Sequence, residues 1–408
     1  MDLIIRAGRN DHTVIDNFLT PAAAGVFTPS RQPIDAVVAD ASVAAQRPQL
    51  QRITTDAGVP YLIDPVTPLL QSEQAPTDSW AALPFAQPEP LAPGDINDYV
   101  LDELAERVID FQRSTGATHL IPPYFYSNKR DDVWWRANLT LLRRTGQHLD
   151  REGVNLPVIP VLAVSLREYG PEMTWERGLD TYLAATSELN TESVALSWSW
   201  NNPSRSKQAA LALLLGATAH AASRSSVIGW RAGTFGLALA AAGANGYETG
   251  IGERESLHYV SLAASRRPKP DSNQPRAQAY TYFSEFGRSV PRRAGEAILQ
   301  DPRIMGSFVC SPDNNCCAEG VDSMLHQWRE HTVRERRREL TQLESMPAAR
   351  AWRLNHIEQK AERAIVLATS ANEALAEARI DVRIPTESFA ALHEVAASMR
   401  AGQNRKVA

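Results

Sequence analysis

Acidic side chains stand at the ends of several short apolar segments of this 408-residue chain. Asp40 ends the run Ala-Val-Val-Ala, Asp64 follows Tyr-Leu-Ile, and Glu248 follows Gly-Tyr. If these segments are parallel strands, their carboxyl ends meet where ligands bind in α/β folds. Carboxylates gathered there can serve as nucleophile and as general acid or base, because neighbouring like charges split their pKa values. We predict Asp40, Asp64 and Glu248 as catalytic residues, with helix capping as the alternative for each.

Aromatic, amide and guanidinium side chains fall at the same level of the predicted strands. Flat rings suit stacking on a base or a sugar face, and a planar guanidinium suits an anionic group. Core packing of the rings, and an ion pair between Arg231 and Glu248 or Asp64, are the alternatives. The predicted substrate-binding residues are Tyr124, Tyr126, Trp198, Trp200, Asn201 and Arg231.

The three cysteines of the chain lie close together, at positions 310, 316 and 317, and two histidines follow them. Three thiolates and one imidazole form a closed tetrahedral shell for a structural Zn²⁺. Met324, Leu325 and Trp328 mark the buried face of the following helix, and at 100° per residue His331 lies about 20° from Met324, whereas His326 points away. We predict Cys310, Cys316, Cys317 and His331 as ligands, with Pro312, Asp313 and Asn314 as a tight turn. Three thiols without metal are the alternative.

Short runs that are apolar throughout must position these residues. They lie near residues 36, 61, 118, 158, 194, 227 and 246, with an eighth near 280–286 that includes Glu285, and helical patterns separate them. Strands of this kind are buried on both faces, as in parallel sheets covered by helices. The order predicts a (β/α)8 TIM-type barrel with a C-terminal α-helical extension, and a doubly wound sheet is the alternative. Residues 3–6 are expected to add an N-terminal strand.

Length and composition fit one large domain with an appendage. The chain has 43% hydrophobic and 22% charged residues, and a net charge of -5. We predict a barrel over 1–309, a zinc-binding segment with its helix over 310–345, and helices over 346–408. No apolar run reaches the roughly 18 residues of a membrane span, and the start lacks the pattern of a signal peptide. With three clustered cysteines, this predicts a cytoplasmic protein with no membrane partner.

A barrel followed by three cysteines, one histidine and a helical tail resembles the tRNA-guanine transglycosylase superfamily. The stretch GTFGLALAAAGANGYETG, residues 233–250, is similar to the family's segment in which a Gly-Ala turn precedes the strand of the catalytic aspartate. The resemblance covers residues 225–345 and implies that Glu248 holds the nucleophile's position. The chain lacks the family's Asp-Ser-Gly-Gly motif and spaces its cysteines C-x5-CC in place of C-x-C-x2-C.

The resemblance implies an enzyme that exchanges a nucleobase, or acts on a nucleoside, within nucleic acid. One carboxylate would attack the sugar and another would move the proton of the base. Two alternatives stay open. One is a barrel enzyme acting on a small anionic or sugar-like metabolite, with Arg231 binding the anion. The other is a non-catalytic barrel that docks to a protein partner, or to a second copy of itself, through its C-terminal helices.

Overall fold

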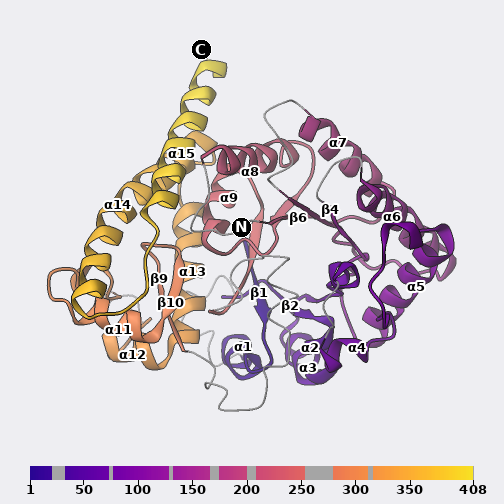
Figure 1. Ribbon diagram of the computed structural model, residues 1–408, viewed down its shortest axis with the longest axis horizontal. Helices are drawn as coiled ribbons and strands as arrows, with labels where there is room; N and C mark the ends of the chain where they lie inside the picture. The colour runs from indigo at the N-terminus through magenta and orange to yellow at the C-terminus, as the bar shows by residue number, and fades with distance from the viewer. Residues whose placement is uncertain are drawn as a thin grey trace.

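Eight parallel strands form the centre of the protein (Figure 1), as the computed structural model shows for residues 1–20, 33–72, 77–127, 132–165, 174–199, 208–252, 279–310 and 316–407. The strands follow the chain in space, with the order β3-β2-β1-β8-β7-β6-β5-β4. They are β1 (Asp2–Ala7), β2 (Ala36–Asp40), β3 (Tyr61–Asp64), β4 (Tyr126–Ser127), β5 (Val161–Ser165), β6 (Val194–Ser199), β7 (Val227–Gly229) and β8 (Gly246–Gly250).

The sheet closes into a ring through residues 118–120, which precede β4 in the chain and link β3 to the segment before β5. A parallel bridge joins Leu62 of β3 to His119, and a second joins Leu120 to Val158, which precedes β5. The amide of Thr118 also donates to the carbonyl of Tyr61 at 2.9 Å. The predicted (β/α)8 barrel is therefore confirmed, because a ring of eight parallel strands with intervening helices defines that fold.

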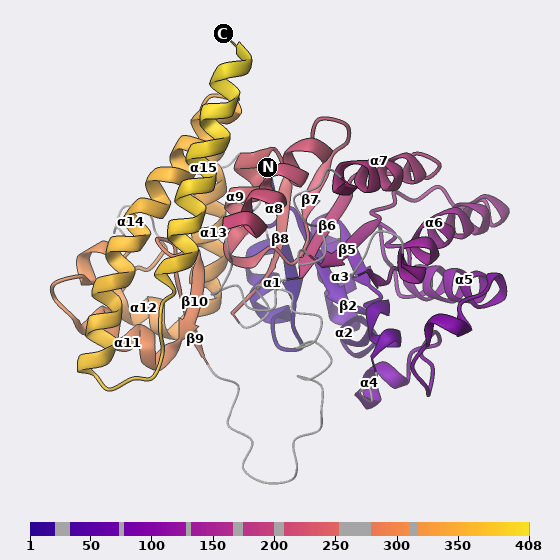
Figure 2. The same cartoon turned by 45° about the horizontal axis from the view of Figure 1, so that its top comes forward.

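Helices cover the outside of the ring (Figure 2). Between the strands lie α1 (His12–Leu19), α2 (Ala41–Gln46), α3 (Pro48–Ala57), α4 (Asp78–Ala81), α5 (Asp98–Ser114), α6 (Val133–Arg151), α7 (Thr174–Thr186), α8 (Gln208–Ala221) and α9 (Gly236–Ala242). Short 3-10 turns stand at Thr67–Gln71, Pro93–Asp95, Gly233–Phe235 and Met305–Ser307. Strand side chains alternate between two cores: Ile4, Val38 and Ile228 belong to the interior, whereas Leu3, Val37 and Val227 pack under the helices.

The prediction for the eighth strand was wrong. Residues 3–6 belong to β1, which pairs with both β2 and β8 inside the ring. Residues 280–283 instead form β9 (Tyr280–Phe283), which pairs antiparallel with β10 (Arg288–Pro291) in a separate two-stranded sheet. The close pairing of β1 and β8 requires Gly246, since a Cβ there would lie 2.2 Å from the carbonyl oxygen of Asp2.

The C-terminal part returns to the barrel. After β10 come α11 (Arg292–Gln300), α12 (Val321–His326), α13 (Trp328–Glu344), α14 (Arg350–Glu377) and α15 (Thr386–Val407). Helix α13 lies against β1 and α9, whereas α14 packs on α9 and α15 packs on α8. The C-terminal α-helical extension is thus confirmed, and the proposed divisions at residues 309 and 345 stay predictions. Among the described helices, none is both long and apolar enough to cross a membrane.

Candidate active site and metal cluster

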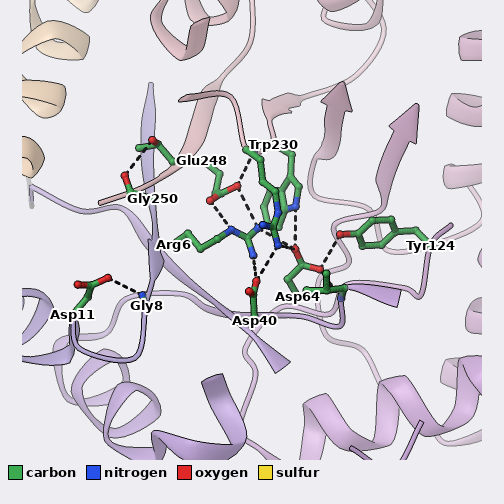
Figure 3. Close-up of polar contacts among 12 residues, drawn as sticks. Arg6, Gly8, Asp11, Asp40, Asp64, Tyr124, Trp230, Glu248 and Gly250 are labelled. Atoms are coloured by element: carbon green, nitrogen blue, oxygen red, sulfur yellow. Dashed lines mark hydrogen bonds and ion pairs between the residues drawn. The ribbon is translucent and has the colours of Figure 1, made fainter. Parts of the chain in front are cut away.

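The predicted carboxylates converge on Arg6 inside the barrel (Figure 3). Asp40 and Asp64 end their strands as predicted, whereas Glu248 lies in the middle of β8, which continues to Gly250. Arg6 projects from β1, and its Nη1 lies 2.5 Å from Oδ1 of Asp40. Its Nη2 lies 2.9 Å from Oδ2 of Asp64, and its Nε donates to Glu248 at 2.8 Å. Strands β2, β3 and β8 supply these three acids, so strand pairing brings together side chains that are far apart in sequence.

Arg231 completes the group from the turn after β7. Its Nη2 lies 2.9 Å from Asp40 Oδ1 and 3.3 Å from Asp64 Oδ2, and its backbone N–H donates to Glu248 Oε2 at 2.6 Å. The ion pair that was the alternative for Arg231 is therefore present for Asp64. We call Arg6, Asp40, Asp64, Arg231 and Glu248 the strand-end network.

Asp64 is the most heavily bonded member of the strand-end network. Its Oδ1 accepts from the hydroxyl of Tyr124 and from the amide of Val66, both at 2.9 Å. Its Oδ2 accepts from the indole N–H of Trp230 at 3.3 Å, in addition to the two guanidinium contacts. Because both oxygens already accept several hydrogen bonds, Asp64 is suited to positioning its neighbours.

Burial and charge fix the ionisation of the two arginines. Burial alone would lower the pKa of Arg6, but the charges of Glu248, Asp64 and Asp40 outweigh it and hold that pKa well above its ordinary value. For Arg231, burial and the charge of Arg6 act downward, and the charges of Asp40 and Asp64 still raise the pKa. Two guanidiniums therefore face three carboxylates inside the protein, and such pairing is what makes buried charges tolerable.

Strained backbone accompanies the strand-end network. Val66 and Arg231 have φ angles of 50° and 51°, in the left-handed region that non-glycine residues rarely occupy. Each of these residues uses its amide to donate to a carboxylate of the network, Asp64 and Glu248 respectively. Strained backbone of this kind clusters at functional sites, where the surrounding structure holds it in place.

The predicted substrate-binding residues do not all lie together. Tyr124 lies in the barrel interior and Tyr126 packs against it. Trp198 packs instead in the layer under the helices, because alternation along β6 places it opposite Ser197, and this corrects the expectation that it lies with the tyrosines. Trp200 and Asn201 fall outside the described residues.

Sequence reasoning did not identify Arg6 and Trp230 as site residues. Arg6 is fully buried, and its guanidinium lies 5.1 Å from the ring centroid of Trp230. A usable signal was present, because a charged residue within the apolar run Leu-Ile-Ile-Arg must have partners if that run is buried on both faces.

The four predicted metal ligands lie together between the C-terminal segments. The Sγ atoms of Cys310, Cys316 and Cys317 lie 3.5, 3.5 and 3.3 Å from Nδ1 of His331, and the two adjacent sulfurs are 3.9 Å apart. A zinc ion with bonds of about 2.3 Å to sulfur and about 2.0 Å to nitrogen would place tetrahedral ligands about 3.5 to 3.8 Å apart. These four residues, the cysteine–histidine cluster, therefore have the spacing of one tetrahedral ion.

His331 is oriented as a metal ligand would be. Its Nε2 lies 2.8 Å from the carbonyl oxygen of Tyr282, so Nε2 carries the proton and Nδ1 faces the sulfurs. Burial lowers the pKa of His331, which favours the neutral ring. Hydrogen bonding with Cys310 raises the pKa of Cys317 to about 12, and a bound cation would favour the thiolate forms. The turn predicted at Pro312, Asp313 and Asn314 falls outside the described residues.

Within the described parts of the chain, the cysteine–histidine cluster is the one group whose donor atoms are close enough to share an ion. The carboxylates of the strand-end network are bound to guanidiniums. The structure thus holds two polar centres of different chemistry, one ionic and one with soft metal-binding donors.

The ring of eight strands with polar groups at its carboxyl ends places the chain in the class of (β/α)8-barrel proteins.

No family model matches the chain, and no curated protein matches it. Two similar solved structures are a candidate phosphonomutase from Burkholderia cenocepacia and the carboxyl transferase domain of Rhizobium etli pyruvate carboxylase. The first has 17% identity and a TM-score of 0.33, and the match covers 65% of this chain and 89% of that one. The second has 11% identity and a TM-score of 0.36, and covers 99% of this chain and 62% of that one. At identities and TM-scores this low, neither an activity nor the role of a residue can be carried over from these proteins to this chain.

Proposed function

We propose that this chain is a barrel enzyme that acts on a small anionic or sugar-like metabolite at the carboxyl ends of its strands. The carrying observation is the strand-end network, in which five charged side chains from separate strands and turns meet inside the barrel beside the carboxyl ends of β2 and β3, the end at which such enzymes bind ligands. The two strained residues beside it support the same site.

The different burial of the five residues suggests that some contact the substrate and others position them. Asp40 and Arg231 have relative solvent exposures of 3% and 7%, whereas Arg6, Asp64 and Glu248 are fully buried. In addition, Nε of Arg231 is buried without a hydrogen-bond partner among the described residues. Arg231 would bind the anionic group and Asp40 would move a proton. The fully buried Asp64 and Glu248, predicted with Asp40 as catalytic, would hold these two groups in position.

Calorimetric titration with ribose 5-phosphate and with ribose tests the anion site. We expect the phosphate to bind more tightly than the neutral sugar, and R231Q to remove that preference. R224Q is the matched control, because Arg224 is an exposed arginine paired with Asp180. Equal affinity for both probes, or a preference that survives in folded R231Q protein, would overturn the proposal.

A transglycosylase-like reaction on a nucleobase is the second candidate. It is supported by the order of elements, since the cysteine–histidine cluster lies in a segment after β8 and its histidine is on the helix that returns to the barrel. Glu248 would then be the nucleophile, but it accepts from Arg6 and from the amide of Arg231 and is fully buried. Filter binding to bulk RNA at two salt concentrations, followed by base exchange in E248Q, tests this candidate.

We also propose that the cysteine–histidine cluster binds one structural Zn²⁺. The support is the tetrahedral spacing of the four donors and the carbonyl that fixes the imidazole. Four protein ligands leave no position for a substrate, so the ion would hold α13 to the loop of Cys310. Elemental analysis of protein purified without chelator should find one equivalent of zinc. Cytoplasmic location and docking through the C-terminal helices stay predictions.

A further inference from the structure

A pocket lies where the C-terminal helices meet the barrel, and the space within it, including open solvent, is about 480 Å³. Its walls come from α9, α13, α14, α15 and the turn between β9 and β10. Neither the strand-end network nor the cysteine–histidine cluster lines it. We call it the C-terminal pocket, and what it binds is independent of the functions proposed above.

Aromatic rings form much of the wall of the C-terminal pocket. Phe235 comes from the turn before α9, Phe286 from the β9–β10 turn and Phe389 from α15. Phe286 and Phe389 are stacked, with ring centroids 6.0 Å apart and an angle of 23° between their planes. Flat walls of this kind suit a flat apolar molecule, since ligand sites combine an apolar lining with a few placed polar groups.

Most of the charged groups in the C-terminal pocket already have partners. Glu339 accepts from the hydroxyl of Tyr282 at 2.6 Å and from Nζ of Lys360 at 2.7 Å. The guanidinium of Arg336 lies 4.5 Å from the ring centroid of Tyr282, and its Nη1 donates to the carbonyl of Gly233 at 3.3 Å. These contacts hold Glu339 and Arg336 in place on one side of the pocket. A different residue would accept a hydrogen bond from a ligand.

Glu285, in the β9–β10 turn, is that residue. Its Oε2 is buried and accepts no hydrogen bond within the described parts of the chain. Its ion pair with Nε of Arg363 is long, at 3.7 Å. A buried carboxylate oxygen without a donor is costly, so a ligand that supplies one N–H or O–H would gain a charge-assisted hydrogen bond.

The charges around the C-terminal pocket define the ligand further. Two cations, Arg336 and Lys360, and two carboxylates, Glu285 and Glu339, line the pocket, so its charges balance. A balanced lining favours neither an added cation nor an added anion. We propose that the C-terminal pocket binds a small, neutral, planar aromatic molecule that donates one hydrogen bond to Glu285.

Ligand-observed NMR titration with indole and 1-methylindole tests this site, because the two probes share the planar ring system, and 1-methylindole has a methyl group in place of the N–H hydrogen. A hydrogen bond to a charged group contributes about 1.5 to 3 kcal/mol, so indole should bind at least about tenfold more tightly. E285L should remove that difference. L392W should block binding by filling the pocket, whereas V366W introduces the same tryptophan on an exposed part of α14 and should not.

Saturable binding of indole that is weaker for 1-methylindole and lost in L392W supports the site. Absence of saturable indole binding, or equal affinity for both probes, overturns it. Binding that persists unchanged in folded L392W protein also overturns it, because indole would then lie elsewhere. E285L gives a second route to the same decision if L392W does not fold.

Discussion

The strand-end network and the cysteine–histidine cluster are both buried polar centres, but they are built in opposite ways. The network takes its members from β1, β2, β3, β8 and the turn after β7, and each acid is paired with a guanidinium. The cluster takes its four members from 22 consecutive positions, 310 to 331, and its donor atoms face one another. Charges that neutralise one another can hold a site rigid, whereas soft donors that face one another can share a metal ion.

The largest expected effect comes from removing the centre of the strand-end network. R6L would leave three carboxylates buried without their main partner, and we expect the free energy of unfolding to fall by about 3 to 5 kcal/mol. R224L is the control: Arg224 is half-exposed, and losing such an ion pair costs about 0 to 1 kcal/mol. Urea denaturation followed by circular dichroism measures both. Similar losses in the two variants would show that the network does not stabilise the barrel.

Metal removal tests the other centre. A chelator should lower the free energy of unfolding by about 3 to 4 kcal/mol, the value for free zinc at roughly 100 to 1,000 times its dissociation constant. C317S should show the lower stability without chelator and hold little zinc. H326Q is the matched control, because the side chain of His326 is 58% exposed and lies outside the cluster. If chelator leaves the free energy of unfolding of the wild-type protein unchanged, the cysteine–histidine cluster is not stabilised by a metal ion.

Tyr282 contacts the cysteine–histidine cluster through its main chain and a different residue through its side chain. Its carbonyl oxygen orients His331, whereas its hydroxyl donates to Glu339. Y282F should lower the free energy of unfolding by about 1.5 to 3 kcal/mol through loss of a buried hydrogen bond to a charged group, and should leave the zinc content unchanged. Loss of zinc in this variant would mean that the ring, and not the main chain, controls the cluster.

The smallest expected effect concerns backbone strain away from both centres. Arg379 follows α14 with a φ of 53° and is exposed. It belongs to neither polar centre. R379G should raise the free energy of unfolding by about 0.5 to 1 kcal/mol, because glycine adopts this conformation without a steric penalty. Thermal denaturation measures the change. A destabilised R379G would show that the arginine side chain makes a contact worth more than the strain.

The sequence by itself determined the order of elements and the cysteine–histidine cluster. Apolar runs separated by helical patterns predict parallel strands because burial on both faces leaves no polar position, and that reasoning is local. The cluster was predictable for the same reason. Its ligands lie close in the chain, and helix phase distinguishes His331, which is buried, from the exposed His326.

Only the tertiary structure decided which strands meet and which groups then pair. The runs at residues 3–6 and 280–283 are both short and both predict a strand, yet only the first pairs with β2 and β8 in the ring, whereas the second forms a hairpin with β10. The register of β6 turned Trp198 away from the interior. The partners of Asp40, Asp64 and Glu248 are set by the same non-local pairing, since Arg6 reaches all three from a strand that is distant from them in the chain.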